Sequence, residues 1–223
     1  EVVTERGPKR DRTTYKARKV IIAIGNRGEP MKLRVPGEEI RMFVQPEPER
    51  ARCCPKCGAA KTGEYFDCAR CGEKLPVRTL PAYEDSKVKY KLTDPETYNN
   101  KKCLVVAAGN SGVEAAVALA GLERRGDQIT FARNNDVTVV VRSDFKNDIT
   151  LRNKMDLYDC MDSGRIEVFF QSTIKEIKEN EVILEDPRTG QEKARIMNDY
   201  LFAFLGSEKS FRFLESLGIR WAD

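Results

Sequence analysis

The sequence predicts an α/β fold: a Rossmann-like three-layer nucleotide-binding domain that carries a small zinc-ribbon insertion. From residue 101 onward, buried-strand patterns alternate with helical patterns in the order βαβαβ…β, which is typical of a doubly wound sheet. Before that point, two C-x-x-C pairs lie only ten residues apart, a spacing typical of a small metal-binding ribbon.

The first hundred residues predict irregular, connecting structure rather than a domain core. Residues 1–19 alternate polar and apolar side chains around Gly7-Pro8-Lys9, which predicts a hairpin. Residues 19–25 form a buried strand pattern that ends in glycine, and four prolines then interrupt the chain before the first cysteine pair. We expect boundaries that divide the chain into 1–46, a ribbon at 47–76, a linker at 77–100, a nucleotide-binding domain at 101–206 and a return segment at 207–223.

The remaining chain predicts the alternating unit. We expect a strand over 102–108, a tight turn, and a helix in which Val113, Ala116, Val117 and Ala120 recur at helical spacing. A polar segment at 123–136 leads to a second strand, and a helix around 151–161 stops at Ser163-Gly164. The further expected elements are short strands at 166–170, 174–177 and 182–185, a buried strand at 200–205, and a short helix at 211–217.

Composition narrows the function classes. The chain has 223 residues, enough for one large or two small domains, and its longest apolar runs are too short to span a bilayer. The net charge is only +4 and basic residues are interspersed with acidic ones, so we expect no nucleic-acid or membrane partner. No apolar signal segment is visible, and the cysteine usage favours a reducing compartment. We therefore expect a cytoplasmic protein.

The chain contains no histidine. Ser-His and Cys-His nucleophilic machinery is therefore excluded within it, as are histidine metal ligands. If chemistry happens here, a cofactor must carry it.

Four of the seven cysteines form the predicted metal site: Cys54, Cys57, Cys68 and Cys71. Two C-x-x-C turns present two thiolates each, and zinc prefers four tetrahedral ligands. Gly58 and Gly72 follow the second cysteine of each pair, where the backbone turns toward sulfur. Rubredoxin-like iron, a dithiol redox pair and a disulfide are the alternatives, and Cys53 could replace Cys54. Four thiolates leave no open coordination position, so we expect a structural role.

A predicted dinucleotide turn follows the first strand of the alternating unit. It runs from Ala107 to Gly112 and takes the place of G-x-G-x-x-G/A, with Ala107 where the first glycine would be. Gly109 allows close approach to a pyrophosphate and Gly112 allows close helix-to-strand packing. The expected nucleotide contacts here are Ala108, Gly109, Asn110, Ser111 and Gly112, with the amides of 110–112 facing a diphosphate. The alternative is a small-residue turn that serves packing alone.

The tip of the second strand predicts which nucleotide binds. Arg142, Ser143 and Lys146 stand where a lone carboxylate would favour NAD, and basic residues there favour the 2′-phosphate of NADPH. NADH is the alternative nucleotide, and a solvated basic loop is the alternative interpretation.

Three passages together resemble a known family. Val20-Ile-Ile-Ala-Ile-Gly25, with Pro30 and Val35-Pro-Gly-Glu38, resembles "v-I-I-A-T-G … P … v-P-G-E" of thioredoxin-reductase-like flavoproteins. The passage from Val105 to Ala116 resembles their "V-V-G-G-G-(D/N)-S-A-x-E-x-A" NADPH turn. The passage from Asn198 to Gly206, with Phe213-Leu and Gly218-Ile, resembles the return strand of the bacillithiol-disulfide-reductase-like branch.

This resemblance implies the NADPH lobe of an FAD-dependent pyridine nucleotide oxidoreductase. FAD-binding segments flank these motifs in the family, so we expect a piece of a longer flavoprotein, with 1–46 a remnant of the FAD-lobe hairpin and crossover strand. Gly206 would admit the nicotinamide end, and hydride would pass from NADPH to FAD. The acceptor beyond FAD is open, because no redox C-x-x-C lies in the lobe and Cys103 and Cys160 are expected to be inert core residues.

The alternative function is a degenerate Rossmann scaffold that acts as a protein-interaction module. Its ribbon would dock a redox partner protein or other domains of the same chain through a basic surface, and a homodimer is also compatible with the sequence. The basic residues expected on this surface are Arg50, Arg52, Lys56, Lys61 and Arg70.

Overall fold

The computed structural model describes residues 1–8, 10–21, 29–46, 49–50, 53–60, 67–126, 128–206 and 211–218. It divides into two compact units, Glu1–Met31 with Gly206–Asp223 and Lys32–Leu205. The first unit contains an antiparallel hairpin, β1 (Val2–Arg6) and β2 (Asp11–Tyr15), and the short helix α3 (Phe211–Ser216). The buried strand expected at 19–25 is not seen at residues 19–21, which are exposed and lie outside the strands, and the rest of it lies outside the described residues.

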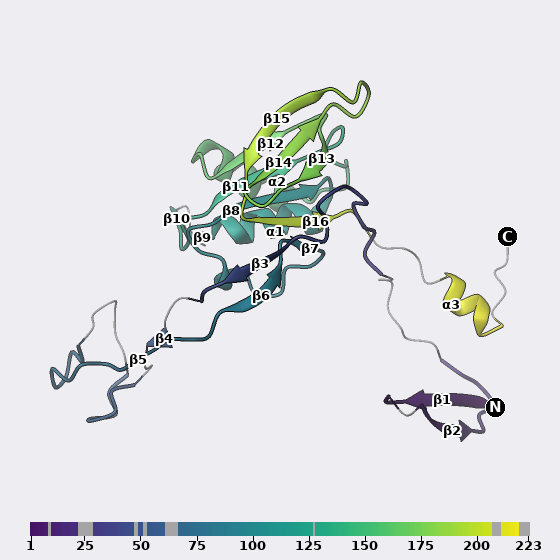
Figure 1. Cartoon of the computed structure of the whole chain (residues 1–223), viewed down its shortest axis with the longest axis horizontal. Coiled ribbons are helices and arrows are strands. Elements are labelled where there is room, and N and C mark those ends of the chain that lie inside the picture. The colour runs from purple at the N-terminus through teal and green to yellow at the C-terminus, as the bar shows by residue number, and fades with distance from the viewer. Residues whose placement is uncertain are drawn as a thin grey trace. The chain divides into compact units, whose positions relative to one another are not determined.

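The second unit is built on a five-stranded parallel sheet in the order β12-β11-β8-β16-β7 (Figure 1). Its strands are β7 (Val88–Lys89), β8 (Lys102–Ala107), β11 (Asp136–Val140), β12 (Ile166–Phe169) and β16 (Tyr200–Phe204). The chain runs outward from β8 to β11 and β12 and then returns to the other side of β8 as β16. This reversal is the switch point of a doubly wound sheet, beside which ligands bind at the carboxyl ends of the strands.

Apolar side chains cover both faces of this sheet because successive strand residues point to opposite sides. On one face, Val105 and Phe202 pack with α1 (Asn110–Ala120) and α2 (Leu151–Asp162). On the other, Leu104 and Leu201 pack against an antiparallel sheet of β13 (Thr173–Ile177), β14 (Glu181–Glu185) and β15 (Glu192–Met197). The result is the three-layer α/β arrangement that the sequence predicts.

Local signals explain where the two helices begin and end. The Thr150 hydroxyl caps α2 by accepting a hydrogen bond from the Asn153 amide at 3.3 Å. Helix α1 is rich in alanine and ends at Gly121, whose φ of +77° lets its amide bond back to the carbonyls of Val117 and Ala118.

Three small antiparallel strand pairs depart from the expected pattern. The polar segment after α1 forms β9 (Leu122–Arg125) and β10 (Gln128–Phe131). The segment expected to be a linker contains β6 (Tyr83–Ser86), the edge strand β7 and the 3₁₀ turn η1 (Pro95–Thr97). Strand β3 (Arg41–Val44) pairs with β6, and β4 (Glu49–Arg50) pairs with β5 (Val77–Arg78).

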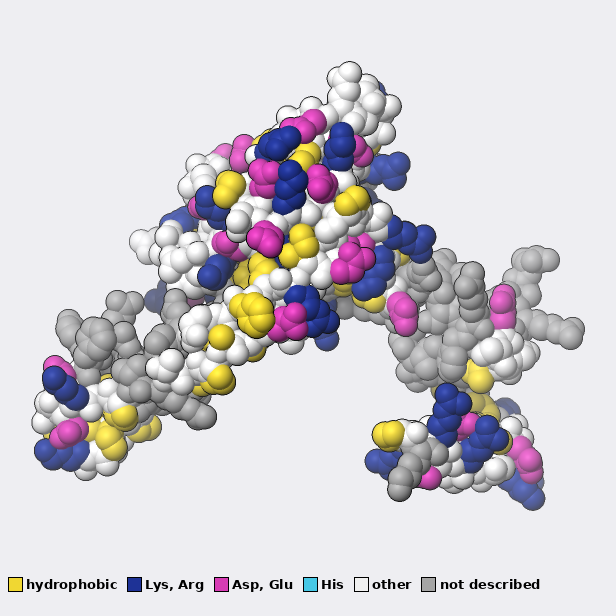
Figure 2. All heavy atoms as spheres, viewed as in Figure 1, with side chains coloured by type: hydrophobic (Ala, Val, Ile, Leu, Met, Phe, Trp, Pro, Cys, Tyr) yellow, Lys and Arg dark blue, Asp and Glu magenta, His cyan; other side chains and the backbone are white. Residues whose placement is uncertain are grey.

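The described surface shows mixed charge. On the face in Figure 2, Lys and Arg side chains are interspersed with Asp and Glu over the parallel-sheet unit. In the described part of the chain, the helices are all too short or too polar to cross a membrane.

Candidate functional site

The turn from β8 into α1, residues 107–112, is called the phosphate turn below. A Cβ atom on Gly112 would lie 1.9 Å from the Cβ of Ala107, so the helix packs on the strand at a distance that only glycine permits. Ala107 is 5% exposed, and its methyl group lies where a side chain on residue 112 would otherwise stand. The methyl is therefore accommodated in the turn.

The amino end of α1 offers unpaired donors. Gly109 is the N-cap residue and makes no side-chain cap, so the first helical amides have no partner within the helix. Among the described residues, the amides of Asn110 and Ser111 donate no hydrogen bond, whereas the Gly112 amide donates to the Gly109 carbonyl at 3.2 Å. Gly112 therefore departs from the expectation that its amide faces a diphosphate, and two free amides remain at the positive end of the helix.

The loop from β11 to α2, residues 142–149, is called the cation loop. The Lys146 amide donates to the Ala108 carbonyl at 2.8 Å, and the Lys146 Cδ lies 3.7 Å from where a Gly109 Cβ would stand. Buried Ile149 anchors the end of the loop in the core. The Lys146 side chain is thus brought against the phosphate turn.

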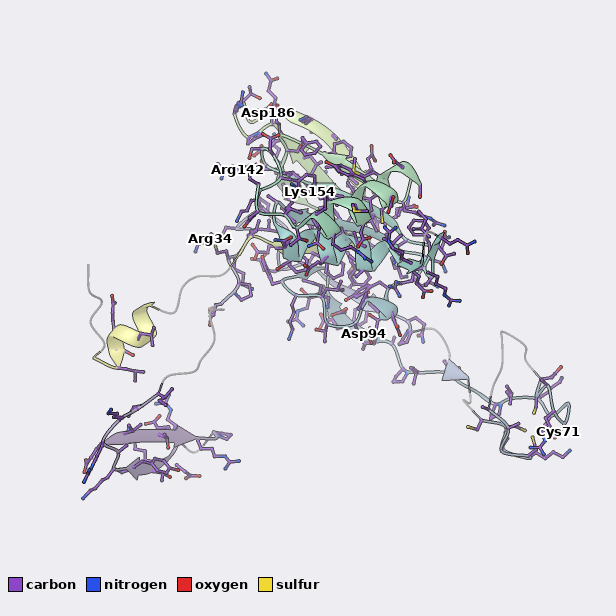
Figure 3. The ribbon with its side chains drawn as sticks, turned by 180° about the vertical axis from the view of Figure 1, so that it is seen from behind. Arg34, Cys71, Asp94, Arg142, Lys154 and Asp186 are labelled. Carbon is purple, nitrogen blue, oxygen red and sulfur yellow. The ribbon has the colours of Figure 1, made fainter. Side chains whose placement is uncertain are left out.

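Arg142 and Ser143 are exposed at the start of the cation loop. Figure 3 shows Arg142 at the surface of the lobe. Neither Arg142 nor Lys146 forms an ion pair with any residue that the structure describes, so both cations are open to an anionic ligand. Gly206 is exposed with a φ of +94°, and it belongs to the first compact unit.

Asn110 has a role that its sequence motif does not show. Its side-chain amide donates to the Asp148 carbonyl at 3.0 Å, and its side-chain oxygen accepts from the Thr150 amide at 2.9 Å and from Asn153 Nδ2 at 2.8 Å. This side chain is therefore used within the protein, and only the backbone of Asn110 remains for a diphosphate. Asn153 could not be found from the sequence, because its contact depends on how α1 and α2 pack.

The four predicted metal ligands come together. The Sγ atoms of Cys54, Cys57, Cys68 and Cys71 all lie within 4.8 Å of one another, and the pairs Cys54–Cys71 and Cys57–Cys68 are 3.6 Å apart. A tetrahedral zinc ion with Zn–S bonds of about 2.3 Å separates its sulfurs by about 3.8 Å. The cluster thus has the spacing of a metal site.

Two similar turns build this cluster. The Cys54 carbonyl accepts from the Gly58 amide and the Cys68 carbonyl accepts from the Gly72 amide, at 2.9 and 2.8 Å. The φ angles of Gly58 and Gly72 are +67° and +70°, a left-handed backbone conformation that favours glycine. The two C-x-x-C-G segments therefore fold alike, as their shared sequence predicts.

The thiols of the cluster differ in pKa. Backbone hydrogen bonds from Arg70 and Cys71 lower the pKa of Cys68 to about 7, which favours its thiolate. At Cys71, a backbone hydrogen bond from Glu73 favours the thiolate, but burial and the other three thiols outweigh it and raise the pKa to about 12. Four thiolates in this space would need positive charge, which a bound divalent metal ion would supply.

The surroundings of the cluster are only partly basic. The Lys56 Nζ lies 3.2 Å from the Glu73 Oε2 in an ion pair. Lys56 is one of the basic residues expected on the docking surface, and this pair neutralises its charge. Arg52, Lys61 and the side chain of Arg50 lie outside the described residues. The other two cysteines of interest, Cys103 and Cys160, are 2% and 0% exposed, and burial raises the pKa of each to about 12. They are buried, inert thiols, as expected.

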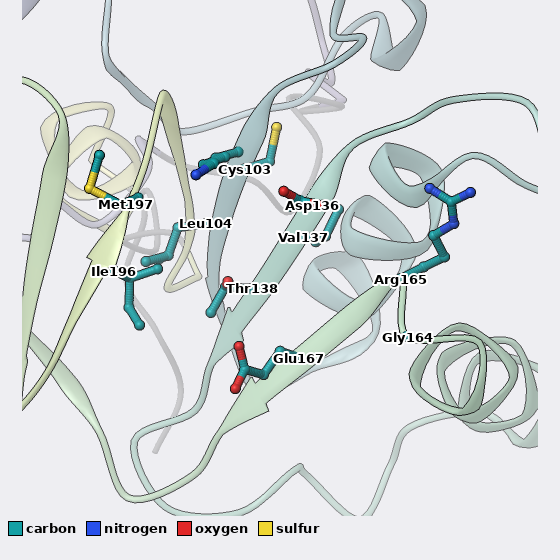
Figure 4. Close-up of a pocket in the computed structure, with 11 residues that line it drawn as sticks. Cys103, Leu104, Asp136, Val137, Thr138, Gly164, Arg165, Glu167, Ile196 and Met197 are labelled. Atoms are coloured by element: carbon teal, nitrogen blue, oxygen red, sulfur yellow. The ribbon is translucent and has the colours of Figure 1, made fainter.

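A groove of about 310 Å³ lies at the opposite edge of the parallel sheet (Figure 4). Lys102, Asp136 and Glu167 line it near the amino ends of β8, β11 and β12, with Met197 of β15 as one wall. Nucleotides bind doubly wound sheets at the carboxyl edge, so this groove is separate from the phosphate turn.

Comparison with known proteins agrees with this arrangement. The chain matches the model of the family "Pyridine nucleotide-disulphide oxidoreductase" over residues 74–223, more than half of its length. It is 28% identical over 144 residues to bacilliredoxin reductase Bdr of Bacillus subtilis, a match covering 63% of this chain and 40% of the relative.

Two solved structures share the fold. Bacillithiol disulfide reductase Bdr from Staphylococcus aureus matches 60% of this chain and 38% of its own, with 25% identity and a TM-score of 0.50. The Bacillus cereus enzyme of the same name matches 61% and 38%, with 23% identity and a TM-score of 0.51. The chain thus spans about two fifths of the length of these relatives. From its sheet topology, its phosphate turn and the family match, the chain belongs to the pyridine nucleotide-disulphide oxidoreductase family.

Proposed function

We propose that residues 101–206 bind NADPH as the nicotinamide lobe of a flavin-dependent oxidoreductase. The observation that carries this proposal is the position of the Lys146 side chain, whose Cδ lies 3.7 Å from where a Gly109 Cβ would stand, beside two amides at the start of α1 that donate to no described residue. A cation and a helix amino end that converge on a glycine-rich turn suit the phosphates of a dinucleotide.

The expected residues of the phosphate turn and the cation loop have separate roles in this proposal. Gly109 and the Asn110 and Ser111 amides hold the pyrophosphate, with Ala108 and Gly112 shaping the turn. Arg142, Ser143 and Lys146 hold the 2′-phosphate. When bound, NADPH supplies a hydride. We propose FAD, held by other parts of a longer cytoplasmic protein, as the group that receives it.

Titration calorimetry of the 223-residue chain with NADPH and with NADH tests the proposal. We expect saturable binding that favours NADPH, and we expect the preference to disappear in Arg142→Ala because the 2′-phosphate loses its partner. Absence of binding at millimolar nucleotide would overturn the proposal. It would favour the alternative, a degenerate scaffold whose ribbon docks a partner protein.

We also infer that Cys54, Cys57, Cys68 and Cys71 hold one structural zinc ion. The sulfur spacing and the need to balance several thiolates support this ligand set. The cluster forms a small core of its own, in which buried Cys54 and Cys68 pack with Leu75. Because this core contains few apolar side chains, the metal supplies much of the stability that a larger apolar core would give.

Elemental analysis of the purified chain tests the metal site. We expect about one equivalent of zinc, and in Cys68→Ser we expect a loss of most of it, because tetrahedral coordination needs all four ligands. Cys53→Ser is the matched control, since Cys53 is exposed and outside the cluster. Equal metal loss in the two variants, or less than half an equivalent in the unaltered chain, would contradict the assignment.

A further inference from the structure

The hydrogen bonds of Asn110 connect the two halves of the proposed nucleotide site. The side chain of Asn110 stands in the phosphate turn, but its three partners lie in the cation loop and the first turn of α2. Its oxygen accepts two hydrogen bonds and its amide donates one, which nearly exhausts what an asparagine can form. The Asn110 side chain therefore links the cation loop to the phosphate turn in a fixed orientation.

Asn153, in the first turn of α2, fixes the orientation of the Asn110 side chain by a hydrogen bond. Its Nδ2 lies 2.8 Å from Asn110 Oδ1 and 2.9 Å from Glu114 Oε1. Its backbone amide donates to the Thr150 hydroxyl that caps the helix. Asn153 thus links the first turn of α2 to two residues one turn apart on α1.

The cation loop has few other attachments near the turn. Lys146 is tied to the turn by one backbone hydrogen bond, from its amide to the Ala108 carbonyl. Phe145 rests on Phe170, with ring centroids 5.3 Å apart, and Ile149 is buried in the core. Together with this backbone bond, the hydrogen bonds of Asn110 to residues 148 and 150 hold the part of the loop that carries Lys146 against the start of α1. Arg142 is placed by its neighbour Val141, whose amide donates to the Phe169 carbonyl and whose carbonyl accepts from the Ser172 amide.

We propose that Asn153 is a positioning residue that sets the preference for NADPH over NADH by holding Asn110 against the cation loop. This rests on the proposed function. A 2′-phosphate is recognised only if Arg142 and Lys146 stand at the correct distance from the pyrophosphate, because one rigid ligand must satisfy both groups at once. NADH lacks this phosphate and is insensitive to where the cations stand.

The test is the ratio of the dissociation constants for NADPH and NADH, measured by calorimetry on the 223-residue chain. In Asn153→Ala we expect the NADPH constant to rise about tenfold, because the hydrogen bond to Asn110 is lost, while the NADH constant changes less than about twofold. Asn153→Gln keeps the donor and is expected to retain most of the preference. Glu114→Ala removes the other partner of the same Nδ2 group and is expected to leave the ratio unchanged.

Each outcome decides the inference. If the unaltered chain prefers NADPH and Asn153→Ala keeps that preference, or loses both affinities in parallel, Asn153 is only structural and the inference is wrong. An equal loss of preference in Glu114→Ala would also overturn it, because the route through Asn110 would not be the cause. If the unaltered chain binds neither nucleotide, the proposed function fails and the inference fails with it.

Discussion

At the phosphate turn, two alanines and one glycine distinguish this chain from the family pattern that it resembles. That pattern has glycine at the places of Ala107 and Ala108 and alanine at the place of Gly112. At positions 107 and 112 the two residue types are exchanged, and the Ala107 methyl fills the space where a Gly112 side chain would stand. One methyl fits between β8 and α1 and two do not, so the departure at Ala107 is compatible with the same backbone.

We expect Gly112→Ala to destabilise the chain by about 1–3 kcal/mol, because two β-carbons would have to share one position. The double variant Ala107→Gly/Gly112→Ala restores one methyl, and we expect it to recover most of this loss. Urea unfolding followed by circular dichroism measures both variants against the unaltered chain. Equal stability of Gly112→Ala and the unaltered chain would show that the helix and strand are not in such close contact.

At the scale of elements, a buried lysine joins strands that are distant in sequence. Lys87 precedes the edge strand β7 and is fully buried, and its Nζ donates to the carbonyls of Glu179 and Asn198, both at 2.7 Å. These carbonyls belong to the turns before β14 and β16. Burial lowers the pKa of Lys87 to about 8, against the opposing effect of the Asp199 and Glu179 carboxylates.

This pKa predicts a pH dependence of stability. Between about pH 8 and pH 10.5 the unfolded chain binds more protons at Lys87 than the folded chain does, so the free energy of unfolding rises with pH in this window. The slope is at most about 1.4 kcal/mol per pH unit. Other titrating groups, such as the buried thiols, contribute equally to the unaltered chain and to a Lys87 variant, so a comparison of the two isolates this lysine.

We expect Lys87→Met to be less stable than the unaltered chain by about 2–3 kcal/mol at pH 7.5, because two buried carbonyls lose their donor. We expect this difference to grow by pH 9.5, where the unaltered chain gains stability from its lysine. Urea unfolding in reducing buffer at the two pH values checks it. A difference that shrinks or stays constant with pH would contradict the assigned direction of the pKa shift.

At the scale of the whole molecule, the sequence predicts the alternating unit well and its additions poorly. Apolar runs such as Val137–Val141 mark buried parallel strands clearly, and the doubled C-x-x-C-G segments identify the cluster of four thiols. The hairpin β9–β10 is missed because both strands are short and β9 is mostly charged, with a turn at Gly126 between them. Strand β7 is missed because two residues carry no periodic signal, and only tertiary pairing with β16 makes them a strand.

The same limit applies within the site. Glycine positions and basic residues can be read from motif spacing, so Gly109 and Lys146 are predictable members. The network of Asn110 and Asn153 is not, because it depends on the packing of two helices whose contacting residues are 43 positions apart in the chain. Residues that hold the candidate site together therefore emerge from the fold, whereas the residues proposed to contact the ligand are visible in the sequence.

The central claim is that the phosphate turn and the cation loop together bind a pyridine dinucleotide. A map of backbone amide chemical shifts in the ¹⁵N-labelled chain, recorded as NADPH is added, tests it most directly. We expect the largest changes at Asn110, Ser111 and Lys146, with the ribbon residues Lys56 and Glu73 unchanged. Changes confined to the ribbon, or to the groove at Lys102, Asp136 and Glu167, would contradict the claim.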